Sequence, residues 1–127
     1  MIANARTDID CARREQVLVE TNVIWLRQAL DLLEELDDDA FVRAPIGQPR
    51  HRVSAHLRHI IEFYDCFLSG LTSAYIDYDA RRRDHLLEKS RAAAARRINE
   101  LIESLQDHRL QNEDFIVMVR MEVPINP

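Results

Sequence analysis

The distribution of glycine and proline constrains the fold of this chain more than any other feature of its sequence. The chain has 127 residues but only two glycines, and its four prolines are Pro45, Pro49, Pro124 and Pro127. Because proline interrupts helices and glycine weakens them, the long stretches without these residues favour uninterrupted helices. We therefore predict an all-α protein, an up-and-down bundle of three long helices that run antiparallel to one another.

The length and the N-terminal sequence indicate how the chain is organised. A chain of this length suits one domain, and we expect residues 11–127 to form it and residues 1–10 to be a flexible N-terminus. Residues 1–10 lack the apolar core of a signal peptide, and nowhere do eighteen apolar residues follow one another. We therefore expect a cytoplasmic protein that does not interact with membranes.

Two apolar stripes run side by side along residues 13–36 and predict a first helix with a wide buried face. One stripe contains Val19, Val23, Leu26, Leu30 and Leu33, and the other contains Leu18, Trp25, Ala29, Leu32 and Leu36. We expect Trp25 to lie in the core rather than to serve as a stacking platform. The acidic residues 34–39 are unfavourable at the negative end of a helix dipole, so the helix should end there. Residues 41–49 are expected to form an irregular connection.

Residues 52–70 predict a second helix, with apolar residues at alternating steps of four and three. These residues are Val53, Leu57, Ile60, Tyr64, Phe67 and Leu71. Gly70 is expected to end the helix as a left-handed cap, and residues 71–84 to form an ordered loop. A third helix should run from its N-cap Ser90 to about Gln106. Residues 114–127 are β-branched and partly alternating, which predicts an extended strand or arm.

The charges and cysteines exclude several classes of partner and site. With 17 Lys and Arg against 22 Asp and Glu, the chain has a net charge of −5, which argues against binding nucleic acids or anionic membranes. Cys11 and Cys66 lie far apart and match no CxxC spacing, so a reducing compartment is expected. We interpret Cys66 as a small buried residue rather than a nucleophile. A small-molecule ligand stays compatible with this composition.

His56 and His59 lie one turn apart on the second predicted helix and are candidate ligands of a divalent metal. A catalytic zinc or nickel site needs about three protein ligands and an open position for water or a thiol. The third ligand could be Glu62, His85, His108 or a residue of another protomer. The alternative is that both histidines are polar residues at one end of the bundle, hydrogen-bonded to their neighbours.

Residues Asp77, Tyr78, Asp79, Arg81 and Arg83 form a second candidate site. The guanidinium groups and carboxylates could grip an anionic substrate near the mouth of the bundle, with Tyr78 as a hydrogen-bond donor. The structural alternative is a network of ion pairs and caps that ties the loop to the starts of the helices. Both interpretations stay open at the level of sequence.

Two motifs together resemble the DinB-like family. They are Val53-Ser-Ala-His56-Leu-Arg58-His59 and Ile76-Asp77-Tyr78-Asp79-Ala-Arg81-Arg82-Arg83, followed by Glu88. The resemblance spans residues 20–127 and implies a DinB/YfiT four-helix bundle with nickel or zinc held by histidines near one end. It also implies a relation to thiol-dependent transferases, without a reaction to transfer. Phe63 stands where the family usually has a further histidine, and the family's fourth helix with a His-Thr-x-His-His-like motif has no counterpart here.

Two functions from different classes follow. The first is a metal-binding enzyme or its remnant, in which His56 and His59 help to hold the metal. The second is a non-catalytic binding or assembly module that has lost the metal-bearing fourth helix. The chain would then be truncated relative to the family, and its open apolar groove predicts a homodimer. The dimer would form through the wide face of the first helix or through strand pairing of residues 115–123.

Overall fold

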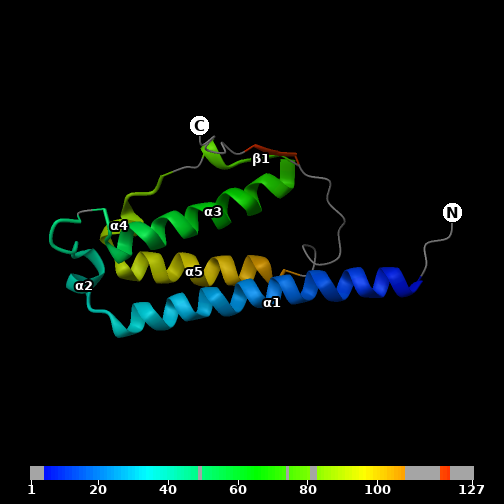
Figure 1. Cartoon of the computed structure of the whole chain (residues 1–127), viewed down its shortest axis with the longest axis horizontal. Helices are drawn as coiled ribbons and strands as arrows, with labels where there is room; N and C mark the ends of the chain where they lie inside the picture. The colour runs from blue at the N-terminus through cyan, green and yellow to red at the C-terminus, as the bar shows by residue number, and fades with distance from the viewer. Residues whose placement is uncertain (1–4, 49, 74, 81–82, 108–117, 121–127) are drawn as a thin grey trace.

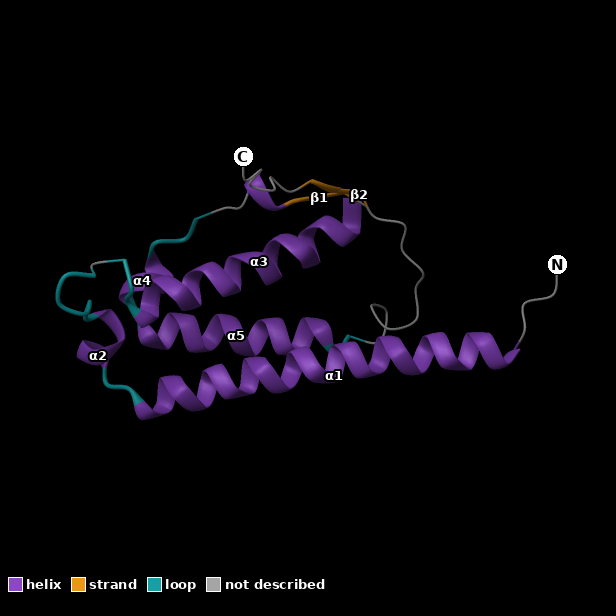
Figure 2. Ribbon diagram, in the orientation of Figure 1, coloured by secondary structure: helices purple, strands orange, loops and turns teal. Residues whose placement is uncertain are grey.

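A computed structural model describes residues 5–48, 50–73, 75–80, 83–107 and 118–120, and these residues are mainly helical (Figures 1 and 2). The three long helices are α1 (Ala5–Glu35), α3 (Val53–Ser73) and α5 (Arg91–Leu105). The short elements are α2 (Asp38–Val42), β1 (Tyr75–Asp77), η1 (Tyr78–Ala80), α4 (Leu86–Lys89) and β2 (Met118–Arg120). The prediction of an all-α protein is confirmed. No helix in the described part of the chain is long and apolar enough to cross a membrane.

The direction of α5 differs from the predicted up-and-down order. α1 and α3 run in opposite directions, but the chain returns along α3 before α5 begins, so α3 and α5 run parallel (Figure 1). The contacts of Arg91, the first residue of α5, agree with this order: its Nη1 donates to the carbonyls of Leu33 and Leu36 at the end of α1, at 2.7 and 2.6 Å. The prediction that α5 is antiparallel to α3 is therefore wrong. α5 begins at the same end of the bundle as α3, and the two helices are therefore parallel (Figure 1).

The first of the two stripes on α1 forms the core, and the second does not. Val23, Leu26 and Leu33 are 2 to 3% exposed and pack with residues of α3 and α5. Trp25 is 60% exposed, so the prediction that it lies in the core is wrong. Leu18 and Leu32 of the second stripe are also exposed, whereas Ala29 of this stripe packs against the core. α1 also begins earlier than predicted, at Ala5, because residues 5–12 contain no proline or glycine that would stop it.

α3 continues past Gly70, so the prediction of a cap there is wrong. The helix ends at Ser73, and the only glycine with a positive φ among the described residues is Gly47, at 77°. Gly70 is needed for close packing instead: a Cβ at this position would lie 2.8 Å from the carbonyl oxygen of Tyr75 and 3.0 Å from the Cα of Ile76. β1 therefore lies directly on the last turns of α3.

The core-facing side of α3 is rotated from the predicted stripe. Ile61 and Leu57 are buried, whereas Ile60 is 43% exposed and Tyr64 and Phe67 are half-buried. The apolar surface of α3 is thus wider than the contact that α5 makes with it. One side of the bundle, next to α1, keeps part of this apolar surface accessible.

α5 begins as predicted. The Oγ of Ser90 accepts a hydrogen bond from the backbone N–H of Ala93 at 3.1 Å, which satisfies an N–H at the start of the helix. Ala94, Ile98 and Leu101 are almost fully buried against α1 and α3. The side chain of Arg91 also binds Asp38 at 2.9 Å, so one guanidinium joins the end of α1, the start of α2 and the start of α5.

The segment predicted to be a loop contains a strand. β1 pairs in parallel with β2, with Tyr75 opposite Met118 and Asp77 opposite Arg120. The extended structure predicted within residues 114–127 is therefore confirmed for Met118–Arg120, and the rest of that prediction lies outside the described residues. Residues 41–49 begin with the last residues of α2, Phe41 and Val42. Asp37 caps the start of this helix by accepting from the N–H of Ala40 at 2.6 Å.

Candidate functional site

A polar cleft lies where α3, β1, the segment before α4 and α5 meet. Its volume is about 880 Å³, within the usual range for small-molecule sites. The cleft is lined by Glu62, Asp65, Cys66, Ser69, Gly70, Ser73, Tyr75, Asp77, Arg83, Asp84 and Arg97. Two of these residues, Asp77 and Arg83, belong to the loop site predicted from sequence. The others come mainly from the side of α3 that is turned away from α1.

A buried ion-pair network fixes one wall of the cleft. Glu62 is 3% exposed, and its Oε1 accepts from Arg58 at 3.3 Å and from the backbone N–H of Asp84 at 3.1 Å. Arg58 also pairs with Glu88 of α4, with 2.8 Å between Nε and Oε1. Because these groups are largely buried, the network ties the segment that carries Arg83 to the middle of α3. Glu62, which the sequence suggested as a third metal ligand, anchors this segment.

A second ion pair closes the floor of the cleft between α3 and α5. The guanidinium of Arg97 binds the carboxylate of Asp65 through two nitrogens and also donates to Glu100 at 2.6 Å. The hydrogen bond with Asp65 is the main cause that raises the pKa of Arg97 above its ordinary value. The two groups form a charge-assisted pair whose opposite charges compensate each other inside the cleft.

The residues of the predicted loop site lie in different surroundings in the structure. Asp77 Oδ1 accepts from the backbone N–H of Asp79 at 3.0 Å, which agrees with the structural alternative of a capping network. The ring of Tyr78 stacks on Phe63 of α3 with 5.0 Å between centroids, and burial raises its pKa. Arg83 lines the cleft. Arg81 lies outside the described residues, so its predicted role stays a prediction.

The thiol of Cys66 lies in this cleft rather than in the core. Its Sγ donates to the carbonyl oxygen of Asp77 at 3.1 Å, and the residue is half-buried. The prediction that Cys66 is a small buried residue is therefore confirmed only in part. Its hydrogen bond joins α3 to β1 at the base of the cleft.

The charges in the cleft differ in how far they are already compensated. Glu62 and Asp65 each bind an arginine. Asp77 and Asp84 each accept from a backbone N–H of their own segment. Arg83, in contrast, is exposed and makes no ion pair or hydrogen bond with the residues that the structure describes. Arg83 is therefore a cation of the cleft that no described carboxylate pairs with, in a cleft that also holds the carboxylates of Asp77 and Asp84.

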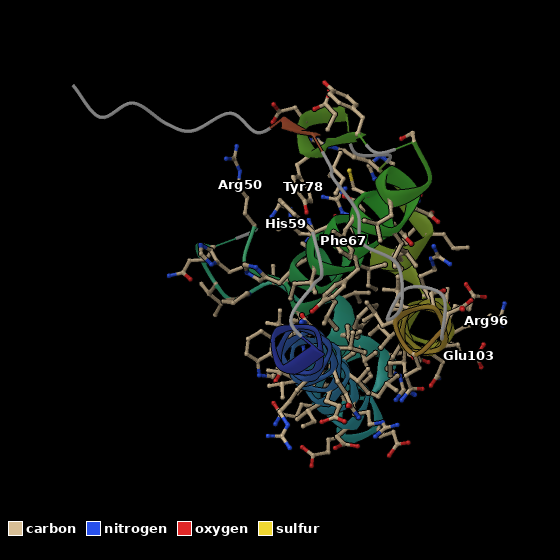
Figure 3. The ribbon with its side chains drawn as sticks, turned by 90° about the vertical axis from the view of Figure 1, so that its right-hand side faces the viewer. Arg50, His59, Phe67, Tyr78, Arg96 and Glu103 are labelled. Atoms are coloured by element: carbon tan, nitrogen blue, oxygen red, sulfur yellow. The ribbon has the colours of Figure 1, made fainter. Side chains whose placement is uncertain are left out.

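His56 and His59 are both exposed on α3, and they contact different neighbours. The ring of His56 lies 5.8 Å from that of His51, whereas the ring of His59 packs edge-on against Phe63 at 4.7 Å. Figure 3 shows His59 and Tyr78 on the same side of the molecule, while Arg96 and Glu103 point outward from α5.

The predicted metal ligands each have other contacts in the described part of the chain. The described part of the chain contains no group of three or more His, Cys, Asp or Glu placed to hold an ion. Of the other candidate ligands, His85 lies beside Glu88 at 3.9 Å, Glu62 belongs to the ion-pair network, and His108 lies outside the described residues. A metal site at His56 and His59 stays a prediction.

Several residues of the cleft were missed by the sequence analysis. Asp65, Ser69 and Arg97 carry no motif, and Arg97 meets Asp65 only because α3 and α5 pack together. The spacing of Arg58 and Glu62, four residues apart on one helix, was the single local signal for the ion-pair network. Comparisons with known protein families, curated proteins and solved structures find no match for this chain. The resemblance to DinB-like proteins therefore stays a prediction.

Proposed function

We propose that this protein is a non-catalytic binding module for a small polar molecule with an anionic group, which the cleft beside α3 would hold. The observation that carries this proposal is Arg83, a cation that lines a cleft of about 880 Å³ and has no described partner. A guanidinium binds carboxylates and phosphates through two parallel hydrogen bonds, which gives both affinity and orientation.

The walls of the cleft suit such a ligand. The carboxylates of Glu62 and Asp65 are already paired with arginines, so they add little repulsion toward an anionic group near Arg83. The hydroxyl group of Ser69 and the exposed ring of Tyr75 offer further polar and apolar contacts. Because the ion pairs hold α3, α4 and α5 together, little ordering is needed when the ligand binds.

The proposal also includes a more specific fold and a cellular location. We infer that α1, α3 and α5 correspond to three helices of a DinB-like bundle, which is supported by the apolar side that they leave uncovered. We also place the protein in the cytoplasm, where thiols such as the free Cys66 are usually kept reduced. The metal-dependent enzyme implied by the resemblance stays a prediction, since the described residues place no group of three ligands that includes His56 and His59.

The proposal is tested by titrating the isotope-labelled protein with citrate and with inorganic pyrophosphate while backbone amide shifts are followed by NMR. We expect saturable shifts at Ser69 and Asp84, and their loss in Arg83→Gln. Arg96→Gln is the matched control, because Arg96 is exposed, points outward from α5 (Figure 3) and is not among the residues that line the cleft. Equal shifts in both variants would mean nonspecific anion binding. No saturable shift with either probe would contradict the proposal for these two ligand classes.

A further inference from the structure

One side of the bundle, between α1 and α3, exposes a band of large apolar side chains, which we call the open face. It consists of Leu18, Trp25 and Leu32 on α1 and Ile60, Tyr64 and Phe67 on α3. Leu18 is 63% exposed, Trp25 60%, Leu32 42% and Ile60 43%. A helix that is apolar beyond its core-facing side has an unpartnered surface.

A hydrogen bond shows that the two halves of the open face border each other. The hydroxyl of Tyr64 donates to Oδ1 of Asn22 at 2.6 Å, so this side of α3 faces α1. On α1, Asn22 lies between Leu18 and Trp25, four residues after one and three before the other, on the same side of the helix. On α3, Tyr64 has the same relation to Ile60 and Phe67. The apolar residues of both helices therefore flank one contact.

The size of the open face matches a weak protein interface. With full side-chain areas of about 150 to 250 Å², its exposed residues present on the order of 450 Å² of apolar surface. A patch of this size is at the upper end of what monomers expose and is often functional. Two such faces together would bury about 900 Å², slightly below the roughly 1,000 Å² of a stable biological interface and in the range of weak ones.

We propose that the open face binds a second copy of this chain, with the two α1 helices antiparallel across a two-fold axis at Trp25. Leu18 and Leu32 lie seven residues before and after Trp25, so this arrangement places Leu18 against the partner's Leu32 and Trp25 against the partner's Trp25. An apolar stripe that reads the same in both directions is self-complementary, as an isologous contact requires.

The charges at the two ends of α1 determine the direction of pairing. Arg13 is exposed near the start of α1, whereas Glu34, Glu35 and Asp37 are exposed at its end. In the antiparallel arrangement the end of α1 that carries Arg13 lies beside the acidic end of the partner's α1, and in a parallel arrangement the acidic ends would lie together. Opposite charges fix register and orientation, and like charges disfavour the alternative.

The length of α1 also favours a second copy as the occupant. α1 has 31 residues and α5 has 15, and the N-terminal part of α1 extends past the end of α5 (Figure 1). In the antiparallel dimer this projecting part of each α1 runs beside the end of the partner's α1 and its α2. The same contact thus covers both the open face and the projecting part of the helix.

Sedimentation equilibrium over micromolar to submillimolar concentrations tests the dimer. We expect the mass to rise from 14.9 kDa toward twice that value, with a Kd on the order of micromolar for an interface of this size. Trp25 is the only tryptophan of the chain, so its fluorescence reports directly on the contact. On dilution, its emission maximum should shift to longer wavelength at the same concentrations at which the mass falls.

Two variants separate the open face from the rest of α1. Leu32→Glu should weaken association at least about tenfold, because it puts a charge in each of the two symmetric contacts with Leu18, and leave Trp25 in a water-exposed environment at every concentration. Ile24→Glu is the control, because Ile24 is 52% exposed but lies about 100° around the helix from Trp25. Both positions are exposed enough to keep the fold, which the helical signal in circular dichroism would verify. A monomer at all concentrations, or equal loss in both variants, would overturn the proposal.

Discussion

Replacement of Glu62 by alanine tests whether the buried ion-pair network holds the wall of the cleft. The variant removes the acceptor of two hydrogen bonds, one from Arg58 and one from the backbone N–H of Asp84. Arg58 would keep its contact with Glu88 at 2.8 Å, whereas the N–H of Asp84 would lose its acceptor. The segment that carries Arg83 would then be released from α3.

The expected loss of stability follows from the burial of the Glu62 carboxylate. Loss of one partner of a buried ion pair costs about 3 to 5 kcal/mol when the other charge is left alone. Since Arg58 keeps Glu88, we expect a loss below this range, about 2 to 3 kcal/mol in the free energy of unfolding. For a chain of this size the midpoint of thermal unfolding should fall by about 10 °C. Glu62→Gln keeps an acceptor for the N–H of Asp84 and should lose roughly half as much.

Thermal unfolding followed by circular dichroism measures the loss of stability. Hydrogen exchange at the Asp84 amide measures whether the segment that carries Arg83 is released from α3. Exchange of this amide should accelerate in Glu62→Ala and stay slow in Glu62→Gln. Glu103→Ala, on the exposed side of α5, should change neither quantity (Figure 3). If Glu62→Ala unfolds within about 2 °C of the parent chain and its Asp84 amide stays protected, Glu62 does not anchor this segment and the reasoning is refuted.

Three further predictions concern other contacts of α3. Gly70→Ala should destabilise the protein by about 1 to 3 kcal/mol because the added Cβ meets the backbone of β1, whereas Ser69→Ala at the neighbouring exposed position should be neutral or slightly stabilising; equal unfolding midpoints would contradict this packing. Burial raises the pKa of Tyr64 above 10.0, so the contribution of the neutral phenol to the free energy of unfolding should be full below pH 10. This contribution should be lost as the pH rises through the folded-state pKa. In Tyr64→Phe, the free energy of unfolding should then fall less at alkaline pH. Zinc or nickel retained after dialysis, measured by mass spectrometry, should be far below one ion per chain and equal in His56→Ala/His59→Ala; stoichiometric metal lost in that variant would support the metal site.

Local signals in the sequence were sufficient for the helices and for part of the core. The Ser90 cap acts within one turn of helix, and the stripe through Val23 and Leu26 has the period of a helix, so both were predicted and both are confirmed. Two adjacent stripes made α1 apolar over a wide face, however. Which stripe becomes buried depends on where α5 packs, and this information is absent from the sequence of α1 itself. The exposure of Trp25 is the result.

The predictions that were wrong or incomplete depend on contacts between distant residues. Glycine is the usual residue of a C-terminal helix cap, so Gly70 suggested a cap. Its small size is instead required by β1, which packs against it. β1 is a strand because β2 pairs with it, and its own sequence of three residues gives little signal. The cleft was likewise found only in part: Asp77 and Arg83 stood out within a charged motif, whereas Arg97 is one of several arginines on α5.

The pairing of β1 with β2 also sets an order of folding. The three helices form largely from contacts between neighbouring residues, which are made quickly. β1 and β2 enclose the whole of α4 and α5 between them in the sequence, and their parallel pairing consists of three residue pairs. Closing so long a segment for so few hydrogen bonds is slow and contributes little until the helices are packed. Since β1 provides Tyr75 and Asp77 to the cleft, the cleft acquires its final shape last, when β2 arrives.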